Sequence, residues 1–176
     1  MIGLRSLYLA SALTLTALLS CGGGEDPILP EPPDIESLTF APELGVDLSQ
    51  MTLTNSGLYF QDIVVGGGIR VGNGDAITFN FQGWLHDGTP VDQGTYPVGM
   101  FSPGGIEGVD GLWYYLIGSG QTLSGWDLGL DQIRVGGLRR LVIPPHLAFG
   151  ASGSLDGRVP GNAVLVYDLE VLTSAP

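Results

Sequence analysis

The chain has 176 residues, of which 18 are acidic and six are basic, and its formal net charge is −12. A surface of that sign repels nucleic acid and anionic membranes, so we expect neither as a direct partner. The length accommodates one domain of about 100–130 residues with flanking segments.

Residues 1–20 have the pattern of an export signal, with Arg5 followed by an apolar run that is short for a transmembrane helix. The single cysteine, Cys21, follows this run in a context that resembles a bacterial lipobox. We therefore expect cleavage before Cys21 and attachment of a lipid to its sulfur. The alternative is a free thiol behind an ordinary signal peptide. The next two residues are glycine rather than aspartate, which by resemblance indicates the outer membrane and a domain facing the periplasm.

Residues 21–54 are rich in proline and acidic residues. We expect them to form an extended tether between the lipid and a folded domain at residues 55–176. Folding is not expected in the tether, apart from an apolar contact by Phe40 or Leu44.

From residue 55 the sequence predicts strands separated by glycine-rich turns. The expected strands are 57–68, Ala76–Leu85, Trp113–Ile117, Leu138–Ile143 and Val164–Leu172. Apolar and polar residues alternate in Ala76–Leu85, which indicates one buried and one solvated face. His86-Asp87-Gly88 predicts a hairpin turn that leads to Val91 and Asp92. Residues 93–112 are then expected to form a long loop rich in glycine.

One short helix is expected between Gly118 and Gly137. Ser124 is its predicted N-cap, Asp127 completes a capping-box pattern, and Gly136 and Gly137 are predicted to end it. Four apolar residues share one face, and these are Leu123, Trp126, Leu130 and Ile133. A helix this short is marginal alone, so that face must lie against a sheet. The expected fold is therefore α+β, with a curved antiparallel sheet of about five strands wrapped around one short helix.

Several chemistries find no support in the sequence. Its two histidines, His86 and His146, both stand in turns without a metal-binding spacing, which argues against a zinc site. No helix or lysine follows the glycine runs, so a phosphate-binding loop is not indicated. We expect no cofactor. The large apolar residues at strand faces and loop rims suit a ligand pocket better than bond-breaking chemistry.

Four segments occur in an order that carries more information than any one of them: SGLYFQDIVVGGG, FQGWLHDGTPVD, GQTLSGWDLGLDQIRVGGLRRLVIPPHLAFG and VPGNAVLVYDLEVL. Together they resemble the FKBP-type peptidyl-prolyl cis-trans isomerases, here in a bacterial lipoprotein form. The resemblance implies a curved sheet around one helix. It also implies isomerisation of X-Pro bonds in exported proteins without covalent catalysis, and binding of rapamycin-like macrolides. We expect a monomer.

The resemblance also implies the site. Trp126 would form its floor and the backbone N–H of Leu123 would hold a substrate carbonyl. The walls would be Phe81, Trp113, Leu123 and Tyr167, and the rim would include Asp92, Phe149 and Val159. Phe81 and Phe149 stand where well-known members have tyrosine, Val91 replaces a phenylalanine, and Thr122 replaces an apolar rim residue. We expect binding to survive these changes, which bear on catalytic efficiency and macrolide affinity.

Two alternatives to an isomerase remain open at this point. One is a non-catalytic binding or chaperone lipoprotein with the same fold and a degraded pocket, and the other is a structural envelope lipoprotein. The loop at residues 93–112 is hypothesised to fold over the pocket, with a surface decoration as the competing interpretation.

Overall fold

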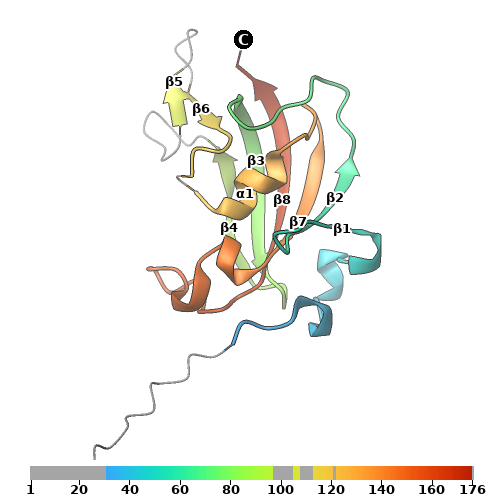
Figure 1. Ribbon diagram of the computed structural model, residues 1–176, viewed down its shortest axis with the longest axis vertical. Coiled ribbons are helices and arrows are strands. Elements are labelled where there is room, and N and C mark those ends of the chain that lie inside the picture. The colour runs from blue at the N-terminus through green and yellow to red at the C-terminus, as the bar shows by residue number, and fades with distance from the viewer. Residues whose placement is uncertain (1–30, 97–104, 108–112, 121, 176) are drawn as a thin grey trace, which may run out of the picture.

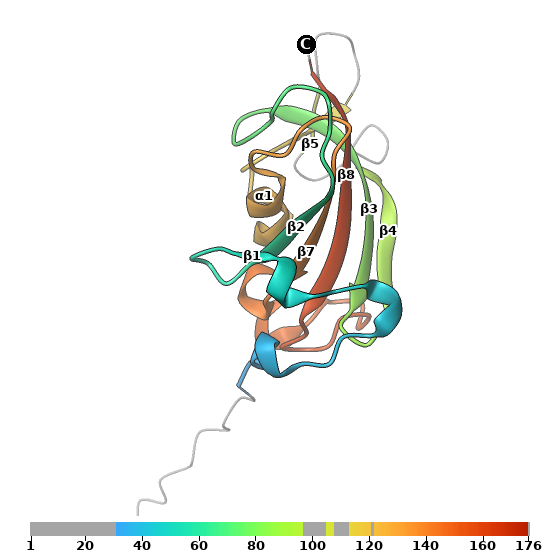
Figure 2. The same cartoon turned by 90° about the vertical axis from the view of Figure 1, so that its right-hand side faces the viewer.

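The computed structural model describes residues 31–96, 105–107, 113–120 and 122–175 (Figure 1). Its strands are β1 (Thr52–Leu53), β2 (Tyr59–Val64), β3 (Ala76–Leu85), β4 (Pro90–Tyr96), β5 (Gly105–Glu107), β6 (Trp113–Leu116), β7 (Leu138–Ile143) and β8 (Leu165–Ser174). They form one antiparallel sheet in the order β1-β2-β7-β8-β3-β6-β5, and β4 pairs with β3. The helix α1 (Ser124–Leu130) lies against one face of this curved sheet (Figures 1 and 2). The α+β fold is confirmed, and β1, β4 and β5 are strands beyond the five that were expected.

The centre of the sheet follows from alternation in β3 and, from Tyr167 onward, in β8. Ile77, Phe79 and Phe81 of β3 are buried on the side of α1, whereas the polar residues between them are more accessible. The predicted face of β8 is likewise buried, with Leu165, Tyr167, Leu169 and Val171 each at most 2% exposed. The predicted bounds of β3 and β7 are confirmed to the residue, and the His86-Asp87-Gly88 turn joins β3 to β4.

The predicted ends of the helix are wrong. Leu123 is the N-cap and Ser124 is already the first helical residue, without a side-chain cap. Asp127 does not close a capping box, because its carboxylate accepts hydrogen bonds from the N–H groups of Gly118 and Gly120 and from the Tyr115 hydroxyl. The helix ends at Leu130, well before the glycines that were expected to end it.

Two glycines of α1 explain how closely the helix approaches the sheet. A Cβ atom at Gly125 would lie 2.5 Å from Ile143 Cγ2, and one at Gly129 would lie 2.3 Å from Leu141 Cδ1. Both neighbours belong to β7, so the helix rests directly on that strand. This contact fixes the position of Trp126, which lies between the two glycines.

The expected loop at 93–112 is partly strand. Residues 93–96 continue β4, and residues 105–107 form β5, which pairs with β6. The other residues of this stretch lie outside the described residues, so its folding over the pocket stays a hypothesis.

The expectation of an extended tether is wrong for residues 34–50, which we call the N-terminal strap. They form three 3₁₀ turns, η1 (Ile35–Ser37), η2 (Pro42–Leu44) and η3 (Leu48–Gln50), and pack on the sheet face opposite α1 (Figure 2). Ile35 and Leu44 are buried there against apolar side chains of β7 and β8. That face carries Val142 and Val166, which need cover from water, and the strap supplies it.

Polar contacts fix the strap in place. The Ala41 N–H donates to His86 O at 2.9 Å, the Tyr59 hydroxyl donates to Glu36 Oε1 at 3.0 Å, and Arg140 donates to the carbonyl of Leu44. Cys21 and the signal-like segment lie outside the described residues. Within the described part, no helix is both long and apolar enough to cross a bilayer.

The strap is expected to contribute to folding stability rather than act as a spacer. Leu44→Ala should lower the free energy of unfolding by about 2–4 kcal/mol, because it empties a buried apolar site. Leu53→Ala is the matched control, since Leu53 is 52% exposed and its truncation should change stability by less than about 0.5 kcal/mol. Urea denaturation of both variants measures the difference. Equal effects would mean that the strap detaches without cost.

Candidate functional site

An aromatic cluster surrounds the helix residue Trp126. Its ring centroid lies 5.5 Å from that of Phe79, 5.0 Å from that of Phe81 and 5.2 Å from that of Tyr167. The contacts to Phe79 and Tyr167 are edge-on, which is a favoured geometry for aromatic pairs. Trp126 is only 5% exposed. The cluster therefore forms a rigid layer between α1, β3 and β8.

A cavity of about 440 Å³ opens beside this layer, between the start of β4 and the loop of residues 149–159. Its lining consists of Val91, Asp92, Phe149, Gly153, Ser154, Leu155, Asp156, Arg158, Val159 and Tyr167. We call it the Tyr167 cavity. The structure thus brings together five residues predicted for the site, Val91, Asp92, Phe149, Val159 and Tyr167. Val91, Val159 and Tyr167 are nearly buried and make an apolar wall.

Four other predicted residues are described by the structure and do not line this cavity: Phe81, Thr122, Leu123 and Trp126. Trp126 and Phe81 lie one aromatic layer deeper, in contact with each other. Leu123 stands at the start of α1, where its carbonyl accepts from the Trp126 N–H at 2.9 Å. No acceptor for the Leu123 N–H occurs among the described residues. The Thr122 hydroxyl bonds the Tyr115 hydroxyl at 2.6 Å, so it is held away from the cavity by the Asp127 network. Trp113 begins β6, and its side chain lies outside the described residues.

Two charged residues at the rim were not predicted, Asp156 and Arg158. Arg158 donates from Nη1 to Val91 O at 3.0 Å and from Nε to Asp156 Oδ2 at 2.5 Å. It thereby ties the 149–159 loop to β4. Hydrogen bonds from Ser154 and then Arg158 lower the pKa of Asp156 to about 2. The sequence indicated only weakly that Arg158 belongs to the site: it is one of six basic residues and precedes Val159, which was predicted for the rim.

The rim carboxylate Asp92 is exposed, and its Oδ1 accepts from the Gln93 N–H at 2.9 Å. Its negative charge acts on the Tyr167 hydroxyl. Burial first, and Asp92 second, raise the pKa of Tyr167 well above its ordinary range. Tyr167 therefore presents a neutral phenol to the cavity at physiological pH. Its ring lies over Gly83, where a Cβ atom would come within 2.3 Å of Tyr167 Cε1, so position 83 must lack a side chain.

The raised pKa of Tyr167 predicts a loss of stability in alkali. The unfolded chain ionises this tyrosine near its ordinary value of about 10, whereas the folded chain keeps its proton, so stability falls as pH rises above about 10. The pKa of Tyr59 is raised too, by burial first, and it adds a slope of the same sign. Tyr167→Phe should therefore flatten the decline without removing it. Urea midpoints of both proteins on either side of pH 10 measure this, and an unchanged slope would contradict the assignment.

Metal chemistry finds no support in the described part of the chain, where no group of histidine, cysteine or carboxylate side chains is placed to hold an ion. His146 instead contacts the carbonyl of Ser56 through Nε2 at 2.9 Å. The site offers an apolar cavity with a charged rim, and its described lining contains no histidine, cysteine or lysine.

Comparison with known proteins identifies similar chains. Residues 67–172 match the family described as FKBP-type peptidyl-prolyl cis-trans isomerase. The human peptidyl-prolyl cis-trans isomerase FKBP9 is 39% identical over 99 residues, which are 56% of this chain and 15% of the relative. FK506-binding protein 4 of Dictyostelium discoideum is 32% identical over 127 residues, 72% of this chain and 31% of the relative. The chain thus spans less than a third of the length of either curated relative.

Two solved structures share the fold. The crystal structure of AtFKBP13 superposes with a TM-score of 0.57 at 31% sequence identity. The match covers 71% of this chain and 98% of the AtFKBP13 chain. The crystal structure of FkpA from Escherichia coli gives a TM-score of 0.56 at 30% sequence identity. The match covers 72% of this chain and 52% of the FkpA chain.

Proposed function

The chain belongs to the FKBP-type peptidyl-prolyl cis-trans isomerase family, and from that premise we propose that it accelerates isomerisation of X-Pro bonds in exported proteins. The observation that carries the proposal is the Tyr167 cavity, whose apolar wall rests on the buried aromatic layer around Trp126. No group in this arrangement needs to donate or accept a proton during the reaction.

The mechanism follows from the chemistry of the amide. Rotation about an X-Pro bond interrupts resonance, and the barrier is about 18–20 kcal/mol. The twisted amide is less dipolar than the planar one, so a dry apolar surface favours the transition state over the ground state. Val91, Val159 and Tyr167 provide that surface. The N–H of Leu123 supplies a hydrogen-bond donor next to Trp126 for a substrate carbonyl.

A protease-free isomerisation assay on the full chain tests this proposal. We expect acceleration with several X-Pro peptides and inhibition by a rapamycin-like macrolide. Asp92→Ala should lower the rate while leaving the protein folded, because Asp92 is exposed and bonds only the neighbouring main chain within the described residues. A folded wild-type chain without any acceleration would reject the isomerase.

The second candidate is a non-catalytic binding or chaperone module with the same fold. It is favoured by one observation: Trp126 is 5% exposed and does not line the Tyr167 cavity. Such a module should suppress aggregation of an unfolded client equally well with Trp126→Leu. An isomerase should lose rate with the same variant, so one pair of assays separates the two.

We also propose that the domain is lipid-anchored through Cys21 at the outer membrane and faces the periplasm. The apolar segment before Cys21 and the two glycines after it support this location. Incorporation of labelled palmitate into the wild type, and its absence from Cys21→Ser, is the expected result. Equal labelling of the two proteins, or none in either, would contradict the anchor.

A further inference from the structure

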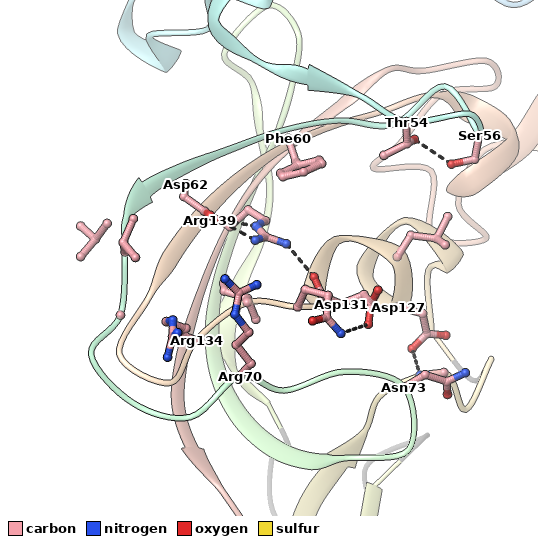
Figure 3. Close-up of a pocket in the computed structure, with 17 residues that line it drawn as sticks. Thr54, Ser56, Phe60, Asp62, Arg70, Asn73, Asp127, Asp131, Arg134 and Arg139 are labelled. Carbon is pink, nitrogen blue, oxygen red and sulfur yellow. Dashed lines mark hydrogen bonds and ion pairs between the residues drawn. The ribbon is translucent and has the colours of Figure 1, made fainter.

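A second cavity, of about 650 Å³, lies between β2, α1 and the loop of residues 65–73 (Figure 3). We call it the Arg70 cavity. Its lining combines cationic residues (Arg70, Arg134, Arg139), carboxylates (Asp62, Asp127, Asp131) and apolar side chains that include Phe60, Val64, Val65 and Leu128. It shares no lining residue with the Tyr167 cavity, and the proposed isomerase has no use for it.

The main chain forces two arginines together at this cavity. The Val71 N–H donates to Ile133 O at 2.9 Å and the Val135 N–H donates to Ile69 O at 3.0 Å, which makes Arg70 and Arg134 direct partners in an antiparallel bridge. Like charges placed opposite one another in this way are destabilising. The chain has only six basic residues, so two of them meeting here is a local cost that a bound anion would relieve.

These two arginines are also not neutralised by the carboxylates nearby. Asp62 is held by Arg139, and Asp127 accepts from the Gly118 and Gly120 N–H groups and from the Tyr115 hydroxyl. Among the described residues, the Asp131 carboxylate accepts only from Gln132 Nε2, at 3.4 Å, and forms no ion pair with either arginine. Arg134 donates to Gly68 O at 2.8 Å. Arg70 is exposed and makes no ion pair or side-chain hydrogen bond with any described residue, and it extends into the cavity in Figure 3.

A strand edge that is only partly paired adjoins the cavity, and its residues 61–64 are Gln, Asp, Ile and Val. β1 pairs only with Tyr59 and Phe60 of β2. Residues 61, 62 and 64 pair with β7 on one side, with an irregularity at Ile63, and with no described strand on the other. Exposed large apolar side chains occur on and near this edge: Ile63 and Val64 belong to β2, and Val64, Val65 and Leu128 line the cavity. An exposed strand edge with apolar side chains nearby is a template for pairing with another extended chain.

We propose that the Arg70 cavity and the free edge of β2 form a second peptide-binding site, which takes an extended segment of a partner protein carrying apolar side chains and a carboxylate. The segment pairs with β2, its apolar side chains lie on Val64, Val65 and Leu128, and its carboxylate accepts hydrogen bonds from the guanidinium of Arg70. Charge complementarity selects this occupant, because the rest of the chain is strongly acidic and repels carboxylates elsewhere.

Fluorescence anisotropy with the full chain tests the site. The probe is a labelled, proline-free octapeptide in which valine alternates with threonine and the last two residues are glutamate. We expect it to bind, and Arg70→Gln should weaken binding about tenfold or more, because a charge-assisted hydrogen bond is lost. Isomerase activity on a short prolyl peptide should stay unchanged. A lysine version of the probe, and one N-methylated along its pairing edge, should not bind.

Arg158→Gln is the matched control, since it removes an exposed arginine from the other cavity and should leave the affinity for the probe unchanged. Amide shifts at residues 64–66 and 70 on addition of the probe give a second, independent readout. The proposal is overturned if the probe does not bind, if Arg70→Gln has no effect, or if Arg158→Gln abolishes binding. It is also overturned by a dimer of the chain alone that Arg70→Gln dissociates, which would assign the edge to a second copy.

Discussion

Replacing Trp126 with alanine should lower kcat/KM for prolyl peptides about 100-fold, since displacement of groups around a reacting substrate by about 1 Å has effects of that size. The same change should lower the free energy of unfolding by about 3–5 kcal/mol. Both follow from its position, because Trp126 contacts Phe79, Phe81 and Tyr167 and is almost fully buried. Without the indole, the Tyr167 ring loses the surface that holds it at the cavity.

A matched control separates the loss of activity from the loss of stability. Leu130 is fully buried in the same helix and does not line the Tyr167 cavity, so Leu130→Ala should destabilise the domain by about 2–5 kcal/mol. Its kcat/KM should stay near the wild-type value at a temperature where both variants are folded. If Leu130→Ala reduces the rate as much as Trp126→Ala, then Trp126 acts only through stability and the binding module becomes the better proposal.

Local sequence pattern was enough to predict the central strands. The buried face toward α1 was predicted correctly for both β3 and β8, although Val166 of β8 is an apolar, buried residue on the opposite face. The alternation works because each strand has one side facing α1 and the other facing away from it. β4 and β5 lack such a pattern, with glycine and polar residues at most positions, and pairing with β3 and β6 makes them strands.

The helix ends could not be predicted, because tertiary contacts compete with the local signals. Asp127 fits a capping box by its spacing from Ser124, yet its carboxylate accepts hydrogen bonds from the N–H groups of Gly118 and Gly120 instead. The apolar contact expected of Phe40 or Leu44 is confirmed, but the rest of the strap was missed for a similar reason. Its apolar residues are irregularly spaced among prolines and acids, and they become a folding signal only when Val142 and Val166 on the far face of the sheet need cover.

The residues of the candidate site were predicted, but not which of them line the cavity and which lie buried behind it. Val91, Asp92, Phe149, Val159 and Tyr167 line one cavity, whereas Trp126 and Phe81 lie behind it. Sequence alone cannot say which of two stacked aromatic rings faces solvent. It also gave no signal for Arg70 and Arg134, which are 64 positions apart and meet only through main-chain hydrogen bonds.

Arg139→Ala should cost about 2–4 kcal/mol of folding stability, because it removes a buried guanidinium and leaves the carbonyls of Gly129 and Asp131 without its donors. Arg139 is 5% exposed, and its guanidinium donates two hydrogen bonds to the Asp62 carboxylate, of 2.6 Å and 3.2 Å. It also donates at 2.9 Å to the carbonyls of Gly129 and Asp131, where α1 ends. One side chain thus caps the helix and joins it to β2 and β7.

Arg139→Lys tests whether geometry or charge matters. A lysine keeps the charge but cannot reach Asp62 and both carbonyls with the planar fork, so we expect it to recover less than half of the loss. Arg158→Ala is the exposed comparison and should cost about 0.2–1 kcal/mol. Urea denaturation with an unchanged m-value measures all three. A cost for Arg139→Ala no larger than that for Arg158→Ala would mean that α1 holds its place through Gly125 and Gly129 packing on β7 alone.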